Sequence, residues 1–279
     1  MLNFLKSGQS CNYSLAVHNT ESRPNPDAIR IGEIIVSKGK KFDQSMTLNI
    51  IPSEIEGPQS YDLSGSNLFC MLSPAIDPQM RSRHQREVIL ISGPSGSGKS
   101  TYCSQVCRAW ERTIRQKIIM FSAIDNDPAF DDIKMKRIPF DKLVDENGEP
   151  NDCIQIEDLK DSLVLFDDVD VISNKSLRNW VQELRNRCLE TGRHYNISMI
   201  ATNHTMQNYQ QTKILNMEAT KIVLFPSSSG AAQIKRYLKS YLGLSPQEIK
   251  DIFALKSRWV MINKTAPRFV MSASEAYIL

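Results

Sequence analysis

The sequence predicts an α/β fold, in which a parallel β-sheet is flanked by helices. One observation is that strand-length apolar runs alternate with helix-compatible segments from residue 87 onward. A second is a glycine-rich loop that joins one such run to a helix. A third is an apolar run that ends in two carboxylates. We therefore expect an α/β domain over residues 87–279, preceded by a β-rich segment over residues 1–86.

Composition sets broad limits on the function. The chain has 279 residues, enough for one α/β core with a small appended domain. Hydrophobic residues make up 41% and charged residues 23%, which is ordinary for a soluble globular protein. The formal net charge of +3 is too small to indicate nucleic-acid binding by itself. No apolar run approaches the length of a membrane span, and no secretion signal is recognised, so we expect no membrane-spanning segment and an intracellular protein.

The six cysteines are scattered and show no Cys-x-x-Cys spacing. Cys103 and Cys107 lie one helical turn apart, but two thiols cannot complete a tetrahedral zinc site. We expect buried, reduced thiols.

The N-terminal segment, residues 1–86, has many turn formers and no helical period. Residues 29–36 and 46–51 have the composition of strands. The segment could form a small β-rich subdomain or arms that pair with a neighbouring subunit, and the sequence does not separate the two.

The glycine-rich loop follows the apolar run 88–91 and fits the pattern G-x-x-x-x-G-K-[ST]. Backbone N–H groups of such a loop, together with the positive end of the next helix, bind phosphate oxygens. Lys99 would reach the β and γ phosphates, and the Ser100 hydroxyl would hold Mg²⁺. The predicted nucleotide-binding residues are Gly93, Pro94, Ser95, Gly96, Ser97, Gly98, Lys99, Ser100 and Thr101.

The apolar run 162–166 continues directly into Asp167 and Asp168. In nucleotide hydrolysis one carboxylate of such a pair orients Mg²⁺, and the next accepts a proton from the attacking water or aligns it. The neighbouring apolar run 197–201 ends in Thr202-Asn203-His204. Asn203 is well placed to contact the γ phosphate or the attacking water, the alternative being a turn cap. For His204 we favour a structural role.

The remaining elements complete the predicted domain. Strands are expected at 118–122 and 221–225, and a strand or short helix within 133–143. A helix over 176–191 would bury Leu177, Trp180, Val181, Leu184 and Cys188, and expose Arg178, Arg185 and Arg187. Helices over 231–242 and 246–254, the second with a capping box, precede a C-terminal hairpin of 259–263 and 268–272.

From the glycine-rich loop to the C-terminus, about two thirds of its length, the chain resembles the genome-packaging ATPases of large DNA viruses. These are the poxvirus and giant-virus branch of the FtsK/HerA superfamily. The resemblance is carried by residues 93–100, by Leu165-Phe166-Asp167-Asp168, and most specifically by the segment from Gly192 to Asn203. The superfamily more often has Asp-Glu where this chain has Asp167-Asp168, which leaves open which carboxylate is the base.

The resemblance implies a RecA-like P-loop ATPase that assembles as a pentameric or hexameric ring and moves double-stranded DNA into a preformed capsid. It implies that Lys99 and Ser100 bind phosphates and Mg²⁺, Asp167 supports the metal, Asp168 polarises water, and Asn203 senses the γ phosphate. ATP and Mg²⁺ are the implied cofactors, and a capsid vertex protein is a further implied partner. The implied location is the host cytoplasm at the site of virus assembly, and also the virion.

A ring ATPase also needs a positive group from the neighbouring subunit, because charge on the transferring phosphoryl group must be neutralised. Arg193 is the first candidate because it lies in the segment that carries the resemblance, and Lys221, Arg187 and Arg236 follow.

Two other functions stay open. A P-loop nucleoside or nucleotide kinase could carry the same loop, although the Asp167-Asp168 pair and the lack of an arginine-rich lid argue against it. An AAA+-type remodelling ATPase shares the carboxylates and a sensor Asn, but it normally adds a longer helical lid than residues 231–254 provide.

Overall fold

The computed structural model describes residues 86–279 except 125, 152–153, 205–208, 256, 266–267 and 274–275. It also describes the backbone of six strands within residues 2–72, and the backbone alone at 209–212 and 276–278. The chain divides into two compact units, residues 77–222 and residues 1–76 with 223–279.

A parallel sheet forms the core of the unit 77–222. Its described strands follow the order β7, β11, β10, β8, β9, and each neighbouring pair is parallel. Every residue of β7, β10 and β11 is buried, which explains why these strands are continuous apolar runs. The region left open at 133–143 forms β9 followed by a 3₁₀ helix, Phe140–Leu143. The bounds are β7 Val88–Ser92, β8 Lys117–Ser122, β9 Lys136–Pro139, β10 Ser162–Phe166 and β11 Ile197–Asn203.

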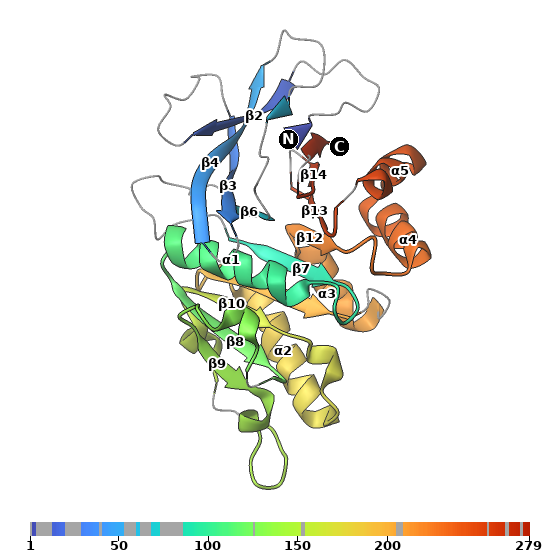
Figure 1. The fold of residues 1–279 in the computed structure, drawn as a ribbon. Helices are drawn as coiled ribbons and strands as arrows, with labels where there is room; N and C mark the ends of the chain where they lie inside the picture. Colours follow the sequence, from blue (N-terminus) through green and yellow to red (C-terminus); the bar gives the residue numbers. More distant parts are fainter. Residues whose placement is uncertain are drawn as a thin grey trace. The chain divides into compact units, whose positions relative to one another are not determined.

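Helix α1 (Lys99–Thr113) begins at the glycine-rich loop, as predicted, and lies across the parallel strands (Figure 1). Residues 102–110 are buried without interruption, and Trp110 is fully buried. Cys103 and Cys107 are buried, reduced thiols, as expected, and burial raises the pKa of Cys103 well above its usual value. Helix α3 (Tyr209–Glu218) was not predicted.

Helix α2 (Lys175–Thr191) confirms the predicted helix, but one arginine that was predicted to face solvent is buried. Asn174 caps its start by accepting a hydrogen bond from the backbone nitrogen of Leu177. Arg185, expected in solvent, is only 3% exposed. It lies four residues after Val181, which is also buried, so helical spacing places it on the packed face. Burial lowers its pKa to about 10, partly offset by the charge of Asp170.

Arg86, two residues before β7, closes the C-terminal end of α2. Its Nη2 donates to the carbonyl oxygens of Cys188 at 2.5 Å and Leu189 at 3.0 Å, and its Nε donates to the carbonyl of Ile197 at 2.9 Å. A Cβ on Gly192 would lie 2.2 Å from the Cys188 oxygen and 3.3 Å from Arg86 Nη2. Space alone therefore requires glycine at the start of the segment that carries the viral resemblance.

Lys221, the first residue of β12 (Lys221–Leu224), forms a buried ion pair with Glu87. The two residues are 2% and 1% exposed. The interior position of Lys221 removes it from the candidates for a group delivered to a neighbouring subunit. Strand β12 itself confirms the apolar run predicted at 221–225.

In the other unit, the N-terminal strands form an antiparallel sheet of order β2-β4-β3-β6 and a two-stranded pair, β1-β5. Strands β3 and β4 contain the two stretches predicted at 29–36 and 46–51. The predicted turns between the strands lie outside the described residues. The bounds are β1 Leu2–Asn3, β2 Tyr13–Asn19, β3 Ile29–Lys38, β4 Lys41–Pro52, β5 Ser60–Tyr61 and β6 Leu68–Leu72.

The C-terminal part of this unit matches the prediction closely. Helix α4 (Ala231–Leu242) is followed by α5 (Pro246–Ala254), whose capping box pairs Ser245 with Glu248 at 2.6 and 3.2 Å. Strands β13 (Val260–Asn263) and β14 (Phe269–Met271) form the predicted antiparallel hairpin. Strand β15 (Ala276–Ile278), which pairs with β14, was not predicted.

No helix within the described part of the chain combines the length and the apolar character needed to cross a membrane.

Candidate nucleotide and metal site

Three parallel strands bring the predicted site residues to one edge of the sheet. Phe166, the last residue of β10, pairs with Ala201 of β11, and Asn203 of β11 pairs with Ser92 of β7. The chain continues from these ends into the glycine-rich loop, the two aspartates and His204. Carboxyl ends of parallel strands are where α/β sheets bind ligands.

The glycine-rich loop has the backbone that its sequence requires. Gly96 and Gly98 have φ angles of +73° and +112°, in the region where a side chain is disfavoured, and Gly98 leads directly into α1. The Gly93 nitrogen donates to the carbonyl of Asn203 at 3.1 Å, which ties the loop to β11. Lys99 is 7% exposed, and its Nζ donates to the Gly93 carbonyl at 2.9 Å and lies 3.7 Å from Asp168 Oδ1.

Asp167 is held by two hydroxyl groups from neighbouring strands. Ser122 of β8 donates to Oδ2 at 3.0 Å, and Thr202 of β11 donates to Oδ1 at 2.8 Å. Burial raises the pKa of Asp167, and the nearby Asp168 raises it further, while the two hydroxyls and Lys99 oppose the shift. Burial and the Asp168 charge therefore disfavour the ionised form of Asp167.

Asp168 occupies an unusual backbone conformation for a residue with a side chain. Its φ is +49°, in the left-handed region, and its backbone nitrogen donates to Thr202 Oγ1 at 2.8 Å. Its Oδ1 lies 2.9 Å from the same hydroxyl. The side chain is 21% exposed, so its carboxylate keeps access to solvent.

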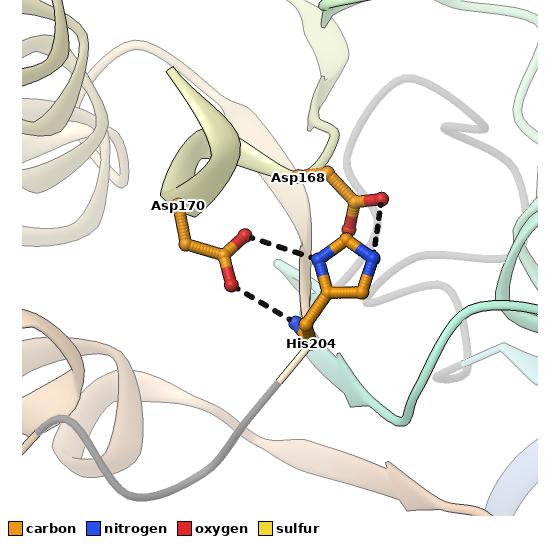
Figure 2. Close-up of side chains that lie close together, drawn as sticks. All are labelled: Asp168, Asp170 and His204. Atoms are coloured by element: carbon orange, nitrogen blue, oxygen red, sulfur yellow. Dashed lines mark hydrogen bonds and ion pairs between the residues drawn. The ribbon is translucent and has the colours of Figure 1, made fainter. Parts of the chain in front are cut away.

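His204 lies against the carboxylates, although the sequence favoured a structural role for it. Figure 2 shows its ring between Asp168 and Asp170. Nε2 lies 3.4 Å from Asp168 Oδ2, and Nδ1 lies 3.6 Å from Asp170 Oδ1. Nε2 is also 3.2 Å from the Oγ of Ser95 in the glycine-rich loop.

The structure thus brings Lys99, Asp167 and Asp168 together as predicted, with Asn203 buried at the same edge. Arg193 is exposed in the turn 192–196, at the opposite end of β11. Seven extended residues separate the two ends, roughly 20 Å, so Arg193 is not part of its own chain's site. The sequence reading missed Thr202, although it is one of three consecutive polar residues at the end of an apolar strand.

The donor set fits a magnesium ion. Mg²⁺ takes hard oxygen ligands and is usually bound by one or two carboxylates together with substrate phosphates. Asp167 offers such a carboxylate, and Ser100, in the first turn of α1, offers a hydroxyl. A divalent cation would also offset the burial and the Asp168 charge that raise the pKa of Asp167.

Residues 89–227 match the ATPase family associated with various cellular activities (AAA). The chain is 40% identical over 197 residues to the uncharacterized protein V3 of the Sputnik virophage, covering 70% of this chain and 78% of V3.

Among solved structures, the chain is similar to the cytoplasmic domain of the type VII secretion ATPase EccC from Thermomonospora curvata. The TM-score is 0.50 at 11% identity, over 90% of this chain and 29% of that one, which shows the fold alone. The genome packaging NTPase B204 of Sulfolobus turreted icosahedral virus 2, in complex with ATP-γ-S, gives a TM-score of 0.44 at 12% identity, over 68% and 97% of the two chains.

The AAA match spans the phosphate loop and both aspartates, and the chain is an ATP hydrolase with the α/β P-loop fold that its sequence predicted. At the identity and coverage it shares with V3, the chain belongs to the family that includes protein V3 of the Sputnik virophage.

Proposed function

We propose that the protein is an ATP-driven double-stranded DNA translocase that packages a viral genome into a preformed capsid and acts as a ring of identical subunits. The observation that carries the proposal is the segment from Gly192 to Asn203. It holds the specific resemblance to viral packaging ATPases, and it forms β11, which pairs with both the phosphate-loop strand and the Asp167-Asp168 strand. The resembling segment is thus the central strand of the nucleotide site.

Each residue of the site has a role in this proposal. The loop 93–101 binds the phosphates through its backbone, and Lys99 binds them through its ammonium group. Asp168 polarises the attacking water, because its backbone is fixed by Thr202 while its carboxylate is partly exposed. Asn203 contacts the γ phosphate from the end of β11.

Ser100 and Asp167 would hold Mg²⁺, which when bound neutralises charge on the phosphate oxygens. The Ser122 and Thr202 hydroxyls orient Asp167 for this task, since each donates to a different carboxylate oxygen. Fixed oxygen ligands of this kind reduce the rearrangement needed at the moment of reaction.

The ring is proposed because Arg193 is remote from its own site. An exposed arginine at the far end of β11 is accessible to a neighbouring subunit, where it would neutralise charge on the transferring phosphoryl group. Double-stranded DNA in the ring and a capsid vertex protein are the proposed partners. The proposed location is the virus assembly site in the host cytoplasm, and the virion.

Steady-state ATP hydrolysis tests the proposal across a protein concentration series, with and without long double-stranded DNA at low salt. Turnover should rise with protein concentration as rings assemble, and again with DNA. Lys99→Ala should lose nucleotide binding, and Asp168→Asn should bind nucleotide without turnover. Turnover indifferent to both variables but switched on by a nucleoside or nucleotide acceptor would indicate a kinase instead.

A second candidate, an AAA+-type protein remodelling ATPase, is favoured by the AAA match over residues 89–227. It predicts turnover that rises with protein concentration and with an unfolded protein substrate, and that does not respond to DNA. The same assay therefore separates the two functions.

A further inference from the structure

The ring of His204 joins two parts of the site that are far apart in the sequence. Its Nε2 lies 3.2 Å from Ser95 Oγ, in the phosphate loop, and 3.4 Å from Asp168 Oδ2. The ring is 25% exposed, so it lines the site without being sealed inside the fold. No other role described above uses this side chain.

Asp170 fixes the position of that ring. Its Oδ2 accepts a hydrogen bond from the backbone nitrogen of His204 at 3.2 Å, and its Oδ1 faces Nδ1 at 3.6 Å (Figure 2). One carboxylate thus contacts both the backbone and the side chain of the same residue. Asp170 lies in the 3₁₀ helix Val169–Val171, which begins immediately after Asp168, so the two aspartates belong to one short segment.

The Asp168 carboxylate is consequently contacted at both oxygens. Lys99 Nζ lies 3.7 Å and Thr202 Oγ1 lies 2.9 Å from Oδ1, and His204 faces Oδ2. The aspartate side chain is short, so the place that its carboxylate reaches depends closely on its orientation. Misplacement of a reacting group by about 1 Å can lower a rate about a hundredfold.

We propose that His204 is a positioning residue, which orients the Asp168 carboxylate and ties it to the phosphate loop through Ser95. Asp170 holds the His204 imidazole in place. The inference rests on the proposed role of Asp168 as the residue that polarises water. It does not depend on DNA, on assembly of the subunits into a ring or on packaging.

Three substitutions of His204 test it by ATP hydrolysis without DNA. His204→Ala should lower kcat about tenfold or more, because the Asp168 carboxylate loses its contact at Oδ2. KM and the affinity for ATP-γ-S should stay within about twofold, because Lys99 and the backbone N–H groups of the loop, which bind the phosphates, are unchanged. His204→Gln places an amide near the position of Nε2 and should recover much of the rate. His204→Asn places its amide near Nδ1, so it should keep the Asp170 contact and recover less.

Asp170→Asn tests whether Asp170 acts through the imidazole of His204. It should lower kcat in the wild-type background and have little further effect when combined with His204→Ala, because the contact it supports is already gone. Thermal unfolding of each variant gives a separate measure of folding. Equal recovery by Gln and Asn, or additive losses in the double variant, would indicate a merely structural role and overturn the inference.

Asp168→Asn distinguishes failure of this inference from failure of the proposed catalytic role. If Asp168→Asn is inactive and His204→Ala hydrolyses ATP at the wild-type rate, the positioning role of His204 is wrong and the role of Asp168 stands. If Asp168→Asn itself retains the wild-type rate, both are wrong.

Discussion

The hydroxyl oxygen of Thr202 accepts a hydrogen bond from the backbone nitrogen of Asp168 at 2.8 Å. The same oxygen lies 2.8 Å from Asp167 Oδ1 and 2.9 Å from Asp168 Oδ1, so its single proton serves one carboxylate at a time. One side chain of β11 therefore fixes the left-handed turn and the two carboxylates at the end of β10.

Thr202→Val keeps the shape of this side chain and removes its hydroxyl. We expect stability to fall by about 1–3 kcal/mol, because the Asp168 N–H loses its acceptor, and kcat to fall with it. Urea unfolding and ATP hydrolysis measure the two effects. Thr202→Ser retains the hydroxyl and should stay near the wild type in both, so equal activity of Val and Ser variants would contradict the role of this hydrogen-bond network.

Asp167→Asn should stabilise the metal-free protein. Because burial and Asp168 raise the pKa of Asp167, the folded state binds more protons than the unfolded chain between the usual aspartate pKa and the raised value. Stability contributed by this group is therefore present below that window and lost as the pH rises through it. Asparagine does not ionise, so we expect the variant to be more stable than the wild type above the window.

Thermal unfolding across pH, with and without Mg²⁺, checks this prediction. The gain should disappear below the usual aspartate pKa, where the wild-type carboxyl is protonated in both states. Mg²⁺ should raise the Tm of the wild type and not that of Asp167→Asn, and the variant should not hydrolyse ATP. A variant less stable than the wild type at neutral pH would show that ionised Asp167 is fully compensated by its neighbours.

The buried pair of Glu87 and Lys221 gives a prediction about folding alone. Glu87→Gln should cost about 3–5 kcal/mol, because it leaves the Lys221 charge buried without its counterion. Replacing both, as Glu87→Leu with Lys221→Met, should restore most of the loss, since no charge is then buried. Urea unfolding measures each, with the exposed Glu183→Gln as a control expected within about 0.5 kcal/mol of the wild type.

Mixing variants tests whether Arg193 acts on a neighbouring subunit. Arg193→Ala should bind nucleotide normally and turn over slowly in the ring, and Lys99→Ala should be inactive. In a mixed ring, an Arg193→Ala subunit can receive Arg193 from a Lys99→Ala neighbour. The ATP turnover of the mixture should therefore exceed that of either variant alone. In a mixture of Lys99→Ala and Asp168→Asn, every subunit carries a defect in its own site, so ATP turnover should not recover. Wild-type turnover by Arg193→Ala would refute the assignment.

Local signals explain what the sequence could predict. The apolar runs of β7, β10 and β11 identify strands because both faces of a parallel sheet are buried. The capping box of Ser245 and Glu248 fixes the start of α5 within four residues. The phosphate loop is equally local, since its glycines, lysine and hydroxyl are adjacent in the chain.

The contacts that the sequence could not predict join different strands. Thr202 reaches Asp168 across 34 positions, and His204 reaches Ser95 across 109. The three polar residues Thr202, Asn203 and His204 at the end of an apolar strand indicated a functional strand end. They did not indicate which of the three side chains faces the carboxylates. For Arg185 the prediction was wrong. Its charge predicted exposure to solvent, but the packed face of α2 is wide enough to include it, and the side chain is buried.

The contacts of Arg86 set a practical limit on shortening the chain. The sequence places the start of the ATPase domain at residue 87, and a fragment cut there would lose the guanidinium that binds the last carbonyls of α2 and the first residue of β11. Starting one residue later would also remove the counterion of Lys221. A fragment meant to fold and hydrolyse ATP by itself should therefore begin upstream of Arg86, and misfolding of a shorter one would say nothing about the need for the N-terminal strands.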